Sequence, residues 1–553
     1  MINKAKRRVL LIRVPQCERS IGQEEKDLSV VRNFQPYLPL SLAYLGAFLN
    51  EYASEDYLVT IEDINTKYVV ESEGYVDCNV MDRMMESVIS DTEYDIIGIS
   101  SAFVNNLDWV QRAVQLANEY HPGKPVILGG GYPTVYPEKS LEQTGADYAI
   151  IGEGEDTLLS LLNRISGVKN SRFEKLFSQI SGYVYRENGE IHTIPKTTVI
   201  DDLDLIPFPA WDILDVEEYL GKQDERMLLG YTSRGCPFRC TYCGTHLAWG
   251  SGIRFRSAEN VLMEIDFMYR EYGIKNIHFV DDNMTANKKR MNTILNGLIE
   301  RDYDLTWQAS NFAVNSLDKE TIALMIPSKM AKVTLAIESG SQSTQKQINK
   351  NLDLKKAEEV FRMFEQYDIP IHLNFMIGFP METVDEIQAT IDLANRLGAH
   401  ETQVNIVTPW PGTELYEYVL KHKNLNREIA MEDMDHRKPV GFVNVPWNYV
   451  ELNHLSYDTN ISLNFVNNRD LNDPKSYPRL MQRWKGLEAS LPQHAILFVC
   501  IGYLHKQMGN LIECNNYYDK AAHLFKKKDV DRAYGKYLNW DNNLIIKDFK
   551  DHM

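Results

Sequence analysis

Three cysteines stand close together in the stretch SRGCPFRCTYCGTH. Cys236, Cys240 and Cys243 have the spacing C-x3-C-x2-C, in a chain of 553 residues with seven cysteines. Chance would produce this spacing in roughly one such chain in a thousand. Iron–sulfur clusters normally take four thiolates, so three close thiolates leave one iron without a protein ligand. The triplet therefore predicts a cluster whose open iron can coordinate a small molecule directly.

Structural zinc is the alternative interpretation of the triplet. Zinc takes four closed ligands, usually in two pairs, and His246, three residues after Cys243, can serve as the fourth. The other cysteines are scattered and the total is odd, which does not suggest a disulfide framework. They are Cys17, Cys78, Cys500 and Cys514.

The surroundings of the triplet resemble the signature of the radical S-adenosylmethionine (SAM) superfamily. An aromatic residue, Tyr242, precedes the third cysteine, and a strand is predicted at 228–233, just before the first. The resemblance implies a [4Fe–4S] cluster on the three cysteines, with SAM bound to the fourth iron through its amino and carboxylate groups. It further implies one-electron cleavage of SAM to methionine and a 5′-deoxyadenosyl radical, and an electron donor such as a flavodoxin or ferredoxin. The cofactors would then carry the hard chemistry.

Five further segments follow the triplet in the order in which this superfamily places them. They are WGSGIRFRSAENVLMEI (249–265), FVDDN (279–283), LAIESGSQ (335–342), NFMIGFPMET (374–383) and TPWPGTELY (408–416). Each is weak alone, but together they extend the resemblance over residues 226–420. The residues that the resemblance implies as SAM contacts are Tyr242, Asp281, Asn283, Gln308, Glu338, Asn374 and Gly378.

Some of these assignments have structural alternatives. Asp281 and Asn283 can equally be solvated polar residues at a strand end. Glu338 follows a predicted strand, where a carboxylate can hold the SAM ribose or ammonium group, or can act as a charge at a helix N-terminus. No catalytic acid or base can be assigned beyond the cofactor ligands.

Strand and helix signals alternate in two long segments. Residues 1–164 predict a doubly wound, Rossmann-like parallel sheet, which binds ligands beyond the carboxyl ends of its strands. Residues 223–435 contain six predicted strands separated by helices, which indicates a partial or complete βα barrel with its chemistry on the loops after the strands. These strands are 228–233, 276–281, 306–310, 333–337, 371–377 and 401–407.

The first segment resembles the cobalamin-binding domain that precedes many radical SAM barrels. The resemblance lies in YLPLSLAYLGAFL (37–49), IIGISSAFVNNL (96–107), and VILGGGYPTVYPE with ADYAIIGEGE (126–138 and 146–155). Small residues at strand ends let a large flat cofactor approach the backbone, and Glu153 can hold a sugar hydroxyl of its nucleotide tail. The cobalamin contacts expected on this basis are Pro15, Leu40, Ser100, Ser101, Val104, Gly129, Gly130, Gly131, Glu153 and Gly154.

One departure concerns the cobalt ligand. Many cobalamin proteins carry Asp-x-His-x-x-Gly, whose histidine ligates cobalt, but the corresponding stretch here, VPQCERSIG, has no histidine. Cobalt would then lack a histidine lower ligand, and Cys17 is either a ligand or incidental. Tyr132 also stands where the family's glycine loop often has a histidine. The alternative is a Rossmann-like module that binds another nucleotide or nothing, although GGG and GEGE do not match G-x-G-x-x-G.

Two other segments carry less information. Residues 165–222 are predicted to be a connector, with a strand-like piece at 182–186 and two prolines in IPFPAWDIL that exclude a regular helix. Residues 436–553 are predicted to be mostly helical and related to substrate binding. Two helices expected within 495–527, broken at Gly509 and Asn510, faintly resemble one tetratricopeptide unit; a plain helical cap is the simpler interpretation.

Charge and hydropathy narrow the possible partners. The net charge of −18 disfavours nucleic acid. No apolar stretch approaches the ~20 residues of a membrane span. The N-terminus, MINKAKRRVLLIRV, is interrupted by Arg13 and has no cleavage site after it, so it predicts a first strand in a cytoplasmic protein.

Together these features predict an α/β cobalamin-dependent radical SAM enzyme. The expected reaction is methylation of an unactivated carbon, or of phosphorus, in a small-molecule or peptide natural-product intermediate, through methylcobalamin and a 5′-deoxyadenosyl radical. Ring contraction, cyclisation or another rearrangement is the main alternative. A methylthiotransferase should have three further N-terminal cysteines, where only Cys17 and Cys78 occur. A non-catalytic sensor is a third class.

Overall fold

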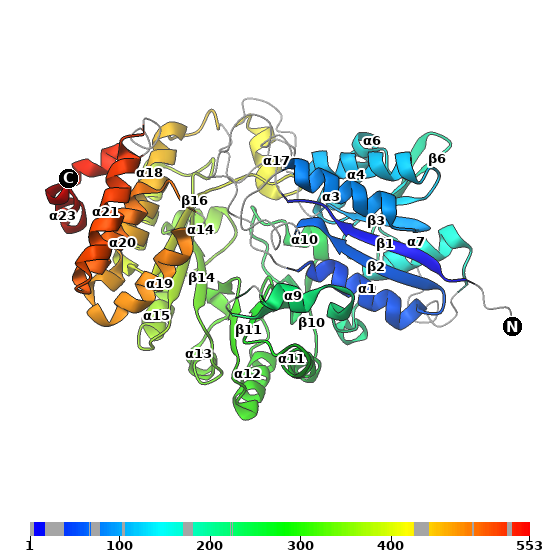
Figure 1. The fold of residues 1–553 in the computed structure, drawn as a ribbon, viewed down its shortest axis with the longest axis horizontal. Helices are drawn as coiled ribbons and strands as arrows, with labels where there is room; N and C mark the ends of the chain where they lie inside the picture. Colours follow the sequence, from blue (N-terminus) through cyan, green and yellow to red (C-terminus); the bar gives the residue numbers. More distant parts are fainter. Residues whose placement is uncertain are drawn as a thin grey trace.

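The computed structural model describes residues 5–16, 38–65, 67, 78–101, 106–169, 181–221, 223, 225–424, 442–488, 491–527 and 534–553. A Rossmann-like α/β region, a central open barrel and a helical C-terminal region follow one another along the long axis of the molecule (Figure 1). This confirms the predicted architecture. Within the described ranges, no helix is both long and apolar enough to cross a membrane.

The N-terminal sheet has seven strands in the order β2-β1-β3-β4-β5-β6-β7, and β1 to β5 are parallel, as predicted. The centre of β1 is buried at Leu10 and Ile12, because helices cover both faces of the sheet. The strands are β1 (Arg7–Arg13), β2 (Tyr57–Asp63), β3 (Ile96–Ser100), β4 (Val126–Gly129) and β5 (Tyr148–Ile150). The helices are α1 (Leu40–Ala53), α3 (Cys78–Asp91), α4 (Leu107–Tyr120), α5 (Gly131–Val135), α6 (Pro137–Thr144) and α7 (Glu155–Ser166).

The predicted connector does not stand apart from this sheet. Its strand-like piece is β6 (Tyr183–Glu187), which pairs antiparallel with β5, and β7 (Glu190–Ile194) pairs with β6. The hairpin therefore extends the N-terminal sheet, and only the part after β7 links the two α/β regions, through α9 (Val216–Gly221).

Six parallel strands form the open barrel. They lie in two sheets, one ordered β12-β11-β8 and the other β13-β14-β15-β16, where β13 (Phe312–Ala313) is a short addition. The six strands are β8 (Met227–Gly230), β11 (Asn276–Phe279), β12 (Thr306–Ala309), β14 (Val333–Glu338), β15 (Ile371–Ile377) and β16 (Glu401–Ile406). The helices outside them include α11 (Ala258–Tyr272), α12 (Lys288–Arg301), α14 (Gln342–Gln347), α15 (Leu354–Phe364), α16 (Val384–Leu397) and α17 (Glu414–Lys421).

The helical C-terminal region covers the edge strand β16. Asn460, on α18 (Tyr449–Ile461), accepts a hydrogen bond from Val404 N and donates one to Val404 O, both at 2.9 Å. One turn later, Asn464 accepts from Thr402 N at 2.9 Å and donates to Thr402 O at 2.7 Å. Side-chain amides thus take the place of a seventh strand and satisfy the open edge.

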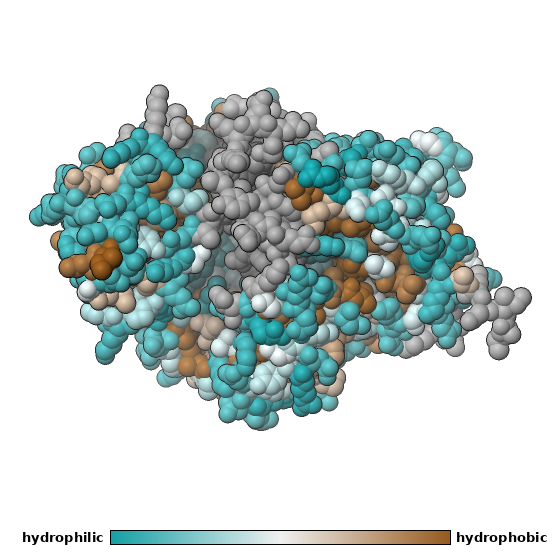
Figure 2. All heavy atoms as spheres, in the orientation of Figure 1, coloured by the Kyte–Doolittle hydropathy of each residue, from teal (hydrophilic) through white to brown (hydrophobic). Residues whose placement is uncertain are grey.

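The remaining helices pack into a separate core. They are α19 (Tyr477–Glu488), α20 (Ala495–Gln507), α21 (Leu511–Phe525) and α23 (Leu544–His552). The break expected near Gly509 lies between α20 and α21, which confirms the predicted helix pair. The face in Figure 2 is mostly hydrophilic over the barrel helices, while apolar side chains gather over α1 and β2, where Leu58 is exposed.

Candidate active site

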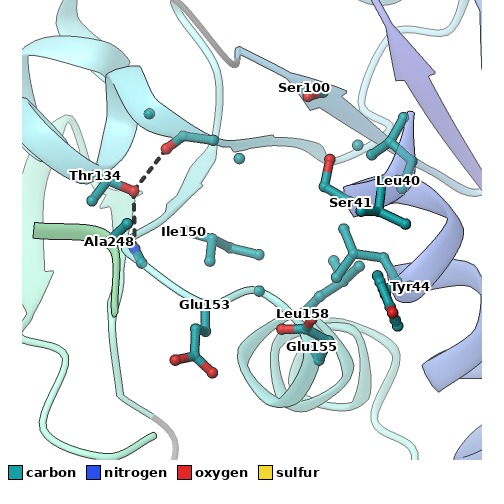
Figure 3. Close-up of a pocket in the computed structure, with 18 of the residues that line it drawn as sticks. Leu40, Ser41, Tyr44, Ser100, Thr134, Ile150, Glu153, Glu155, Leu158 and Ala248 are labelled. Carbon is teal, nitrogen blue, oxygen red and sulfur yellow. Dashed lines mark hydrogen bonds between the residues drawn. The ribbon is translucent and has the colours of Figure 1, made fainter. Parts of the chain in front are cut away.

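A cavity of about 420 Å³ lies between the N-terminal sheet and the barrel (Figure 3). One wall consists of the start of α1, the carboxyl ends of β3 and β4, and the loop after β5. The other wall comes from the barrel region and contains Tyr231, Arg234, Trp249 and Asp282. The cavity is therefore shared by both regions, and it lies where a doubly wound sheet places its ligands.

The glycine-rich loops leave this cavity open. A Cβ atom added at Gly129 would meet nothing within 4 Å. Thr134 ties two of the loops together, because its hydroxyl donates to Gly130 O at 2.7 Å and accepts from Gly152 N at 3.0 Å (Figure 3). Gly152 has φ +73°, and a Cβ there would lie 3.1 Å from Ala248 O. This close approach of the two walls requires glycine.

Most of the expected cobalamin residues line the cavity. These are Leu40, Ser100, Gly129, Gly130, Gly131, Glu153 and Gly154. Pro15 and Ser101 are buried nearby but are not part of the lining. Val104 and Cys17 lie outside the described residues, so the questions about them stay open. An open, largely apolar space lined by glycine loops fits a large, flat cofactor.

Glu153, the expected sugar contact, lies where the two walls of the cavity meet. Its side chain is 0% exposed, and its carboxylate accepts hydrogen bonds at 3.1 Å from Arg234 Nη1 and from Arg254 Nη1. Glu155 pairs with the other nitrogen of Arg234 at 2.5 Å. Burial favours a higher pKa for Glu155, but the charge and hydrogen bond of Arg234 outweigh it and lower the pKa. These carboxylates therefore join the two walls.

The first cysteine, Cys236, ends β9 (Ser233–Cys236), and the other two lie before α10 (Thr245–Trp249); β9 pairs with β10 (Gly252–Phe255) in a hairpin. Gly235 has φ +87°, and a Cβ there would lie 2.5 Å from Gly252 O, so only glycine fits. Beyond the hairpin, Thr241 N donates to Ile348 O at 3.0 Å and Thr241 O accepts from Leu415 N at 2.9 Å. The barrel thus fixes the cysteine loop on two sides.

The thiols suit the expected cluster. All three are free and half-buried, and Asn283 Nδ2 donates to Cys236 Sγ at 3.8 Å. Burial raises the pKa of Cys236, and that of Cys240 to about 11, so iron binding would release protons. In the described part of the chain, no three His, Cys, Asp or Glu side chains converge as on a single metal ion. A four-iron cluster takes its three thiolates on three different irons and needs no such convergence.

Asp281 holds the strand that leads to this loop. Its carboxylate accepts hydrogen bonds from Thr232 N at 2.9 Å, from the Thr232 hydroxyl at 2.7 Å and from the Ser233 hydroxyl at 2.5 Å. Burial raises its pKa, and these donors oppose that rise. Its oxygens thus accept hydrogen bonds from the protein itself, and the contact to SAM stays a prediction.

The other expected SAM residues lie in the cysteine loop and on or just after barrel strands, and each contacts another residue. Gln308 Nε2 lies 3.4 Å from Met227 Sδ, and Asn374 Nδ2 donates to Asn311 Oδ1 at 2.7 Å. Glu338 pairs with Lys350. Burial raises the pKa of Tyr242, so its hydroxyl stays neutral beside Cys240. Gly378, at φ +84°, donates its N–H to Glu382 at 2.8 Å.

Comparison with known proteins matches two parts of the chain to family models. Residues 231–394 match the model of the radical SAM superfamily, and residues 35–162 match that of the B12 binding domain. An uncharacterized methyltransferase of Pyrococcus horikoshii is 30% identical over 390 residues, which cover 70% of this chain and 79% of the relative. This chain belongs to the cobalamin-binding radical SAM enzymes.

Two further relatives extend the comparison. The cytidylyl-2-hydroxyethylphosphonate methyltransferase of Streptomyces wedmorensis is 27% identical over 484 residues, 79% of this chain and 88% of that protein. The solved structure of OxsB, a cobalamin-dependent SAM radical enzyme, with aqua-cobalamin and SAM bound, has a TM-score of 0.64 at 16% identity. The match covers 99% of this chain and 84% of OxsB, and it shows the shared fold. The cofactors of this enzyme are a [4Fe–4S] cluster, SAM and cobalamin.

Several residues of this radical SAM enzyme escaped the sequence analysis. Asp282, next to the predicted Asp281, accepts a hydrogen bond from the Thr245 hydroxyl at 2.9 Å and lines the cavity. Burial raises its pKa. Arg234 and Trp249 flank the cysteine motif and reach the cobalamin wall. The only sequence signal for these three residues was that they lie within the signature segments. A linear motif does not show which of its side chains face another domain.

Proposed function

We propose that this enzyme transfers a methyl group to an unactivated carbon, or to phosphorus, of a small molecule or peptide. The observation that carries the proposal is the shared cavity of about 420 Å³, which lies between the expected cobalamin residues and a barrel wall whose Arg234 and Trp249 flank the cysteine motif. The printed names of the relatives from Pyrococcus and Streptomyces, both methyltransferases, support it. A site between two domains is also a usual place for a reaction chamber.

When bound, the cluster with SAM supplies one-electron radical chemistry and cobalamin supplies a methyl carrier. The chain's own residues position these groups. Cys236, Cys240 and Cys243 hold the cluster, and Asp282, through the Thr245 hydroxyl, fixes the start of α10 beside the cavity. Arg234 stacks over the Trp249 ring with 5.0 Å between its guanidinium carbon and the ring centroid. The two side chains form part of this wall of the cavity.

The partners are part of the proposal. A flavodoxin or ferredoxin would supply electrons in the cytoplasm, and neither nucleic acid nor a membrane would take part. The phosphonate named in the Streptomyces relative supports a small polar substrate. The helical C-terminal region, which adjoins β16, would contribute to substrate choice.

The proposal is tested by product mass and by the source of the methyl group. Reconstituted enzyme, a low-potential reductant, SAM labelled in its methyl group, and candidate phosphonates and peptides are incubated without oxygen. Methyl transfer predicts a labelled product heavier by one CH2 group. A product without added label would contradict methylation and would indicate rearrangement or cyclisation instead. Cys240→Ala should fold but produce no 5′-deoxyadenosine; normal formation by this variant would contradict the cluster assignment.

A further inference from the structure

A charged pair lies beside the cysteine loop. Lys350 Nζ is 3.1 Å from Glu338 Oε1, and both side chains are only 12% exposed. Glu338 was expected to contact SAM, whereas Lys350 carries no role so far. Because little water surrounds the pair, neither charge is strongly screened.

The backbone holds Lys350 in one position. Asn349 and Asn351, on either side of it, have φ +54° and +53°, a conformation that asparagine tolerates better than most residues. Lys350 N and Asn351 N both donate to Gln345 O, at 3.1 and 2.9 Å. The Lys350 side chain therefore extends from a turn whose backbone is held by hydrogen bonds.

This turn is also hydrogen-bonded to the cysteine loop. Thr241 N donates to Ile348 O at 3.0 Å, and Asn349 Nδ2 donates to Arg239 O at 2.7 Å. Both contacts lie next to Cys240 in the sequence. The turn that carries Lys350 is thus held against the backbone on both sides of Cys240.

Glu338 is fixed by the same unit. It ends β14 with φ +73°, an uncommon conformation that persists only where the surroundings enforce it. Gln345 Nε2 donates to the carbonyls of Ile337 and Ser339, the neighbours of Glu338, at 2.7 Å each. Gln345 therefore ties the strand end that carries Glu338 to the turn that carries Lys350.

Both charges belong to the unit that is hydrogen-bonded to the backbone on either side of Cys240, through Arg239 O and Thr241 N. A cluster bound by thiolates becomes more negative when it takes up an electron. A fixed cation nearby therefore favours the reduced form, and a fixed anion favours the oxidised form.

We propose that Lys350 and Glu338 set the reduction potential of the cluster from opposite directions, with Lys350 raising it and Glu338 lowering it. Both are positioning residues, which act through the thiolate of Cys240. The proposal rests on the proposed function only in requiring that the cluster be bound at the three cysteines. The electron comes from an external carrier, and no bond is made or broken in this step.

The test is a redox titration of the reconstituted holoenzyme without SAM, monitored by electron paramagnetic resonance. Lys350→Met should shift the midpoint to more negative potential, so that the reduced fraction at the wild-type midpoint falls several-fold. Glu338→Gln should shift it to more positive potential. Lys350→Arg keeps the charge and should stay near wild type. Lys346→Met removes an exposed lysine of α14 and is the matched control, without a shift.

An unchanged midpoint in Lys350→Met, or shifts of Lys350→Met and Glu338→Gln in the same direction, would overturn the proposal. If Lys350→Met does not retain iron, Glu338→Gln decides alone, because a structural effect has no reason to raise the potential. The iron content and SAM cleavage of the wild-type enzyme report on the proposed function separately.

Discussion

Arg234, two residues before the first cluster cysteine, donates a hydrogen bond of 3.1 Å to Glu153 in the loop after β5. The Arg234 side chain is 3% exposed and that of Glu153 0%. The segment that holds the cluster and the loop that lines the cobalamin cavity are therefore joined by a buried ion pair. This contact fixes how the two cofactor sites face each other.

Loss of this contact should separate the two sites. We expect Arg234→Met to destabilise the protein by about 3–5 kcal/mol, because it removes the arginine partner of the buried Glu155 and one of the two arginines that bind Glu153, and to reduce the cobalt retained per iron. Denaturant unfolding and metal analysis measure both effects. Arg226→Met, which removes a more exposed partner of Glu217, is the control and should cost about 1 kcal/mol or less. Equal behaviour of the two variants would contradict the role of Arg234.

A large side chain at the glycine-lined wall should block the cavity. Gly129→Leu places a side chain in the open space in front of β4, so cobalamin binding should fall at least tenfold, a free-energy change of about 1.4 kcal/mol. The iron content should stay at the wild-type level. Equilibrium dialysis with cobalamin gives the measurement. Gly221→Leu adds the same bulk at another open position, at the end of α9, and should bind normally. Normal cobalamin binding by Gly129→Leu would place the cofactor elsewhere.

The asparagine pairs along β16 should stabilise the barrel edge. Asn464→Ala removes both partners of the Thr402 backbone, and each group left unpaired costs about 1–3 kcal/mol. Urea unfolding should show this loss. Asn542→Ala, at an exposed position, should change little. If both variants are equally stable, the side chains do not replace a strand.

Stability should depend on pH through Glu382. Burial raises the pKa of this carboxyl to about 7, although Gly378 and Phe379 donate to it. Because the folded pKa lies above the unfolded value of 4.5, its contribution is complete below pH ~4.5 and is lost as the pH rises through ~7. Relative to Glu382→Gln, the wild type should therefore lose stability across this window. Urea unfolding at several pH values provides the comparison, and a constant difference would show that Glu382 is not buried in its acid form.

The sequence predicted the chemistry of the site better than it predicted the contacts between its side chains. The spacing of Cys236, Cys240 and Cys243 predicts which residues bind the cluster. Short runs of hydrophobic residues predict the six barrel strands. The internal hydrogen bonds of Asp281 could not be predicted, because its donors, Thr232 and Ser233, lie almost fifty residues earlier in the chain. Burial of such a carboxylate depends on the tertiary structure, so a polar residue at a strand end looks the same whether it faces a ligand or its own protein.

The interface between domains was the part least accessible to sequence analysis. Glu153 follows a recognisable glycine pattern, but its partners Arg234 and Arg254 belong to another domain. Lys350 lies in a turn with no motif of its own. Its significance comes from its distance to Glu338 and from the hydrogen bonds between that turn and the cysteine loop.

The most direct measurement is the metal content of the chain after anaerobic reconstitution with iron, sulfide and cobalamin. Our account predicts about four irons and one cobalt per chain, with the cobalt lost in Gly129→Leu and the iron lost in Cys240→Ala. Four irons without cobalt in the wild-type protein would contradict the central claim that one chamber serves both cofactors.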